Sequence, residues 1–172
     1  MNKFETAREI LDCIHIPSLI QAIRDITPPP LESCGGVIVF AIIKSTEPIE
    51  FSMASMSVGE PQNNINTQLS TAISNYIALN ERRLDGRLKE IASSTRIQPS
   101  GSEHVNPFRA GCIVGFNGPD RQIYVSFAGT GSGLIDEALS YVIARRLGFQ
   151  MPPYENSHMH KVNNLTQNVV TL

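Results

Sequence analysis

A glycine-rich stretch, SFAGTGSGLIDEAL, is the part of the sequence whose residue types first suggest chemistry. It joins an apolar run to an amphipathic one. A strand–glycine loop–helix junction of this kind points free backbone N–H groups at an anion. The residues of this turn are therefore our first candidates for contact with a ligand: Gly129, Thr130, Gly131, Ser132 and Gly133.

Three features of the turn argue against a phosphate as that ligand. Its glycines follow a G-x-G-x-G spacing, with Leu134 where the dinucleotide-binding fingerprint needs a glycine, and no lysine follows as a P-loop requires. Asp136 and Glu137 fall in the first turn of the following helix, where carboxylates complement the positive helix end and repel a phosphate. The pattern favours a capped strand-to-helix turn, with a ligand contact as the alternative.

The segment 92–109 is the second candidate region, because it shows neither helical nor strand periodicity. An unpatterned segment of this length in a compact domain is often functional or mobile. His104 lies in this segment, close to Asn106 and Arg109. Its imidazole could serve as a haem ligand or as a general base, whereas the simpler interpretation is an exposed histidine in a loop. We take His104 and Arg109 as candidate ligand-binding residues.

Nucleophilic and metal chemistry have less support in the sequence. Ser126, Ser132, Asp136 and His104 form a triad only on paper, because one sequence does not show which residues meet, so no catalytic residue is assigned. His158 and His160 would face the same way in an extended segment, but no third ligand lies near them, and we predict no metal site.

Composition narrows the function classes further. The 172 residues carry a net charge of −2, and the only basic clusters are Arg82-Arg83 and Arg145-Arg146, which we interpret as solvated helix charges. A nucleic-acid partner is therefore not expected. The longest uncharged apolar run is about half of the ~20 residues that a membrane helix needs, so no membrane partner is expected either. Three widely spaced cysteines without a C-x-x-C motif indicate a reducing, cytoplasmic location.

The elements that must position these residues follow an order α-α-β-β-α-β-β-α. Helical spacing predicts four helices, over 4–14, 17–26, 64–91 with a break or kink at Gly86, and 134–147. Runs of β-branched residues with turn residues between them predict two hairpins, one of strands 36–44 and 49–57 and one of strands 111–117 and 121–128. Two hairpins side by side make an antiparallel sheet flanked by helices, which is an α+β fold. We expect one domain over 1–149 and an extended or loose C-terminal tail over 150–172.

The second half of the chain resembles a known family. The stretch IVGFNGPDRQIYVSFAGTGSGLIDEALSYVIA is similar to the C-terminal hairpin and helix of the GlcG/HbpS-type family, which is described as haem-binding or haem-degrading. The match runs through the Val125–Gly129 segment, the turn and Asp136-Glu137-Ala138, and the resemblance covers roughly 35–148. It implies a profilin-like fold, haem as a cofactor and a homo-oligomer assembled through the sheet and its flanking helices.

Three functions follow as competing hypotheses. The first is a non-enzymatic small-molecule-binding or sensor-like domain, with a pocket between the segment 92–109 and the glycine turn. The second is a structural or interaction module that works by homo-oligomerisation, docking through Phe149, Met151 and the final NVVTL. The third is a haem-degrading or hydrolytic enzyme.

Overall fold

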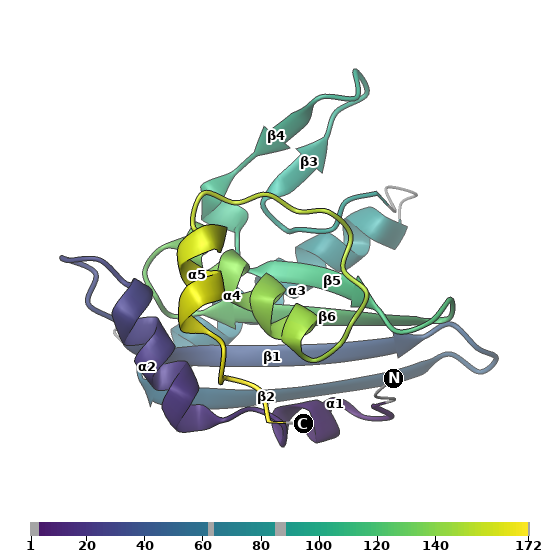
Figure 1. Cartoon of the computed structure of the whole chain (residues 1–172). Coiled ribbons are helices and arrows are strands. Elements are labelled where there is room, and N and C mark those ends of the chain that lie inside the picture. The colour runs from purple at the N-terminus through teal and green to yellow at the C-terminus, as the bar shows by residue number, and fades with distance from the viewer. Residues whose placement is uncertain (1–3, 62–63, 85–88, 172) are drawn as a thin grey trace.

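One four-stranded antiparallel sheet, in the order β2-β1-β6-β5, forms the centre of the fold (Figure 1). The computed structural model describes residues 4–61, 64–84 and 89–171. The strands are β1 (Cys34–Lys44), β2 (Glu50–Glu60), β5 (Cys112–Phe116) and β6 (Arg121–Ala128). The two hairpins join through antiparallel β1–β6 pairing, so the predicted α+β class with a two-hairpin sheet is confirmed.

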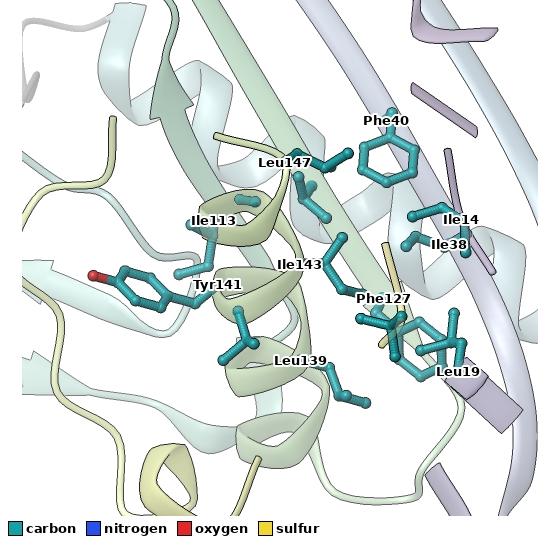
Figure 2. Packing of buried hydrophobic residues seen from close by; sticks show 14 of the residues in the cluster. Ile14, Leu19, Ile38, Phe40, Ile113, Phe127, Leu139, Tyr141, Ile143 and Leu147 are labelled. Carbon is teal, nitrogen blue, oxygen red and sulfur yellow. The ribbon is translucent and has the colours of Figure 1, made fainter. Parts of the chain in front are cut away.

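Alternation along the strands divides the core into two layers. Ile38, Phe40 and Ile42 of β1 face a large cluster formed with helices α1 (Ala7–Leu11), α2 (Ile16–Ile26), α4 (Gly133–Arg146) and α5 (Met159–Leu165). Figure 2 shows this cluster from close by, with Leu139 and Ile143 of α4, and Leu147 at its C-terminal end, beside Phe40 and Phe127 of the sheet. Val37, Val39 and Ala41 point the other way, to helix α3 (Ile65–Leu84).

The predicted helix over 64–91 is shorter in the structure. Helix α3 ends at Leu84, and Gly86, where we expected a break or kink, lies outside the described residues together with Leu88. Beyond the gap, Ile91 runs as extended chain, with its carbonyl accepting from Val114 N at 2.9 Å.

The segment 92–109 is not a structureless loop, and that prediction was wrong. It contains the hairpin of β3 (Thr95–Ile97) and β4 (Glu103–Val105), followed by the 3-10 helix η1 (Pro107–Arg109). The hairpin projects away from the main sheet (Figure 1). Strands of three residues are too short to show a period in the sequence, which explains the error.

The C-terminal tail is docked on the helices. Its second half forms α5, which packs against α4 and α2, and Val162 and Val169 are fully buried. Phe149 is also buried, with its ring edge-to-face against Phe4 at 5.9 Å between centroids. The expectation that Phe149 and the NVVTL end dock on a neighbour was therefore wrong for Phe149 and Val169, because both cover the chain's own core. Met151 and Val170 are partly buried against the same core, and Leu172 lies outside the described residues.

Candidate functional site

A pocket of about 140 Å³ lies at the base of the β3–β4 hairpin. Its walls come from α3, from Ser93 and Ser94 ahead of the hairpin, from the hairpin itself, and from η1 with the residue before it. The lining residues are Arg82, Ser93, Ser94, Arg96, His104, Asn106 and Arg109. His104 and Arg109, the two candidates from the segment 92–109, thus lie in one cavity.

Strand alternation decides which hairpin residues face this pocket. Arg96 and His104 are directly opposite each other in the β3–β4 pair, so both side chains lie on the same face. Glu103 and Val105 alternate to the other face, where they line a separate hollow of about 280 Å³ with Tyr154 and Glu155 of the tail. The hairpin therefore presents its cationic face to the pocket and keeps its carboxylate away from it.

Arg82 is the buried anchor of the pocket, with only 8% of its surface exposed. Its Nε donates to the buried Glu90 carboxylate, and its Nη2 donates to the carbonyls of Ala92 and Ser93 at 3.2 and 3.1 Å. Glu90 also accepts from the backbone N–H of Ile97 at 3.2 Å, which ties the hairpin to α3. The guanidinium plane is thereby held in one orientation at the pocket wall.

Arg82 was not predicted as a site residue, because the sequence pattern of Arg82-Arg83 was interpreted as solvated charge. Arg83 is buried as well, at 3% exposure, and donates to the Glu90 carbonyl at 2.8 Å. A signal was present in the helical spacing, because Arg82 and Arg83 lie three and four residues after the fully buried Leu79. Arg96, Ser93, Ser94 and Asn106 carried no comparable signal, and only the fold brings them together.

A fully buried carboxylate, Glu137, binds Ser93 and Ser94, which form the floor of the pocket. It accepts five hydrogen bonds: from Ser93 Oγ, Ser94 N, Ser94 Oγ, Gly111 N and Tyr154 OH. Burial raises the pKa of Glu137, while the bonds from Ser94 and Tyr154 oppose that rise. With every lone pair engaged, Glu137 is a structural group that joins α4, the pocket floor and the tail.

The glycine turn is closed against the protein and is not among the residues that line this pocket. Thr130 is fully buried, and its N–H and hydroxyl both donate to Asp136 Oδ1, at 3.0 and 2.7 Å. Ser33 Oγ donates to the Gly129 carbonyl at 2.6 Å. The amide of Thr130, which an anion would need, is therefore already occupied by a carboxylate from the chain itself.

The glycines of the turn allow close backbone packing. A Cβ on Gly129 would lie 2.4 Å from Gly36 Cα, and a Cβ on Gly133 would lie 2.4 Å from the Pro107 carbonyl oxygen. The second contact places the start of α4 directly against η1, beside Arg109. Gly131 has a φ of 79°, a conformation that L residues rarely adopt. Gly129 thus packs against β1, and Gly133 supports the segment that carries Arg109.

Asp136 and Glu137 play different parts from those predicted. We expected both to complement the positive end of the helix, and Asp136 does so by binding Thr130. Glu137 instead points to Ser93, Ser94 and Gly111, inside the protein. Adjacent helical residues differ by about 100° around the axis, which is why two neighbouring carboxylates face different surroundings.

The pocket is arranged for binding more than for covalent chemistry. Ser94 has its hydroxyl proton on Glu137, and no hydrogen bond joins Ser94 to His104 in the described ranges. Within those same ranges, no group of three or more His, Cys, Asp or Glu side chains is placed to hold a metal ion. None of the helices described is long and apolar enough to cross a membrane.

Haem does not fit this pocket. A volume of about 140 Å³ is below the range of roughly 300–1,000 Å³ that encloses drug-sized ligands. Its walls are guanidinium, imidazole, amide and hydroxyl groups, whereas a porphyrin needs apolar side chains over both faces.

Comparison of the chain with protein-family models, with curated proteins and with solved structures found no match.

Proposed function

We propose that this chain is a small-molecule-binding or sensor-like domain, and that its binding site is the pocket at the base of the β3–β4 hairpin. The observation that carries the proposal is the meeting of His104 and Arg109 with Arg82 and Arg96 around one cavity. The side chains come from four separate segments, so a ligand there would contact α3, both strands of the hairpin and η1 at once. Binding of a ligand would therefore affect the position of the hairpin, which is what a sensor requires.

The resemblance to the GlcG/HbpS-type family supports the fold part of this proposal. A sheet with α3 on one face and α4 on the other agrees with a profilin-like arrangement, while the polar lining of the pocket does not support haem as the ligand. A cytoplasmic location belongs to the proposal too, and the free thiols of Cys13, Cys34 and Cys112 support it.

Binding at this pocket is tested by titrating the protein with three sets of small fragments, acids, neutral amides and amines, and following backbone amide shifts by NMR. We expect at least one set to shift the amides of Ser94 and Asn106, and His104→Ala to weaken that binding by about threefold or more. His160→Ala, an exposed histidine on the tail, is the matched control and leaves it unchanged. If no fragment of any set shifts these amides, the proposed function is wrong.

A second candidate, self-association, is favoured by an exposed apolar face. Phe51 and Met53 of the edge strand β2 are 56% and 45% exposed, on the side of the sheet that α3 occupies. Ile77 and Leu84 of α3 are also exposed. Asn75 of the same helix donates to the Ala110 carbonyl, next to β5. Ile77 and Leu84 lie on the opposite side of the helix from Asn75, and this is the side towards β2.

These four exposed side chains, Phe51, Met53, Ile77 and Leu84, are called the apolar face below. Exposed apolar patches mark interaction sites. The molar mass of the protein in solution tests this candidate.

A further inference from the structure

We infer that the pocket at the base of the hairpin takes an oxyanion, a phosphate or carboxylate group of a small molecule, with Arg82 as its buried anchor. This inference rests on the proposed function and adds the chemical class of the ligand. Three guanidinium groups and one imidazole surround a cavity of about 140 Å³, which is room for one compact anionic group.

The charge of the pocket is only partly compensated. Arg82 has Glu90 as its partner, and the Glu137 carboxylate behind the floor is taken up by five donors. The side chains of Arg96, His104 and Arg109 make no hydrogen bond or ion pair with another residue in 4–61, 64–84 and 89–171. The pocket therefore carries a net positive charge that a bound anion would neutralise.

Arg82 offers an unused donor from a buried position. Its Nε and Nη2 are engaged, as described, while its Nη1 has no partner among the described residues. The residue is more than nine-tenths buried and lines the cavity. A guanidinium fixed in this way binds an oxyanion without losing further side-chain entropy.

Asn106 adds a further donor to the pocket, while the hydroxyl protons of Ser93 and Ser94 are already given to Glu137. Asn106 Oδ1 accepts from Phe108 N at 3.1 Å, which leaves the Nδ2 amide protons of Asn106 free to donate. The backbone carbonyls of Ala92 and Ser93 accept from Arg82, and that of Ser94 accepts from Asn106 N at 2.8 Å. A lining rich in donors and poor in acceptors matches an oxyanion and disfavours a cation.

Calorimetric titration of the full chain with pyrophosphate, inorganic phosphate and acetate at low ionic strength tests the inference. We expect saturable 1:1 binding of at least one of them, weakened as salt is added. Arg96→Ala and Arg109→Ala should each weaken it about tenfold, since each removes a charge-assisted hydrogen bond from an exposed side chain without disturbing the core. Arg24→Ala, an exposed arginine on α2, is the matched control and leaves binding unchanged.

Arg82→Lys separates a specific anchor from general positive charge. It keeps the charge but loses the fork geometry, so we expect weaker binding than in the parent even where the variant is folded. Should Arg82→Lys fail to fold, Arg96→Ala and Arg109→Ala still decide the question.

Three results would overturn the inference. If neutral or cationic fragments shift the amides of Ser94 and Asn106 while none of the three anions does, the oxyanion class is wrong and the proposed binding function stands. If Arg24→Ala weakens anion binding as much as Arg96→Ala does, the binding is a general attraction between charges and no such site exists. When no probe of any class binds, both proposals fall together.

Discussion

At the scale of single residues, two adjacent carboxylates on α4 show how position decides chemistry. Glu137 accepts from five donors and is saturated, whereas Asp136 accepts from the N–H and hydroxyl of one residue, Thr130. Burial raises the pKa of Asp136 from 3.8 to about 7, with the nearby Glu137 adding to the rise and Thr130 opposing it. Asp136 is thus the group whose titration should affect folding near neutral pH.

The raised pKa of Asp136 predicts a specific pH dependence of stability. The folded state holds this proton more tightly than the unfolded state, so the stabilisation is complete below pH 4 and is lost as the pH rises towards 7 and above. Asp136→Asn keeps the acceptor for Thr130 and lacks the titration. Its stability relative to the parent should therefore increase by up to about 4 kcal/mol between pH 4 and 7.

Urea unfolding of both proteins across this pH range measures the difference. Asp120→Asn, a substitution of an exposed aspartate, is the matched control for the loss of one carboxylate. A difference for Asp136→Asn that does not change with pH would mean that the folded state does not raise the pKa of Asp136.

At the scale of elements, two short segments, the β3–β4 hairpin and α5, have roles that were not predicted from the sequence. The β3–β4 hairpin turns Arg96 and His104 inward, and α5 covers one end of α4 with the buried Val162. Neither element is long enough to have formed alone, because isolated helices and hairpins of this size are marginal in water. Their stability must come from contacts with the rest of the domain.

Docking of α5 is tested by Val162→Ala. We expect the free energy of unfolding to fall by about 1–3 kcal/mol, since methyl groups are removed from a fully buried site. Val105→Ala, at a side chain that is 50% exposed, is the matched control and should change it by less than about 0.5 kcal/mol. Equal effects of the two substitutions in denaturant unfolding would show that the tail is not packed as described.

At the scale of the whole molecule, the two faces of the sheet are covered unequally. Helices α1 and α2 lie against β2 on one face, while α3 contacts β1, β6 and β5 on the other and leaves the outward side of β2 exposed. The edge strand also has free backbone groups along its outer side, which can pair with another chain. The apolar face defined above therefore lies next to an unpaired strand edge.

We expect the 18.9 kDa chain to have a larger molar mass in solution at micromolar concentration, measured by light scattering. Phe51→Glu and Ile77→Glu should each return it to the monomer, because a carboxylate on this apolar face would be desolvated on association. Phe108→Glu, at a residue 97% exposed on η1, leaves the mass unchanged. A monomeric parent protein would rule out self-association, and with it this second candidate function.

Local patterns were enough to determine the order of the main elements and the α+β class of this protein. Strand and helix periodicity over runs of eight or more residues, such as 36–44 and 134–147, reports which side of each element is apolar, and the two hairpins follow from their turn residues. The same reasoning argued against the glycine turn as a phosphate cradle from the nearby Asp136, whose carboxylate accepts from the Thr130 N–H in the fold.

Only the tertiary structure decided which polar residues meet. Arg82 lies in α3 and Arg109 in η1, with β3 and β4 between them along the chain, yet both line one pocket. Glu137 of α4 likewise joins Ser94, which precedes β3, to Tyr154, which follows α4. Such contacts depend on long-range packing of the hairpin, α3 and α4, which leaves no period in the sequence. The glycine-rich turn drew attention by its composition, while the pocket that we propose as the site is assembled from arginines that composition alone describes as ordinary surface charge.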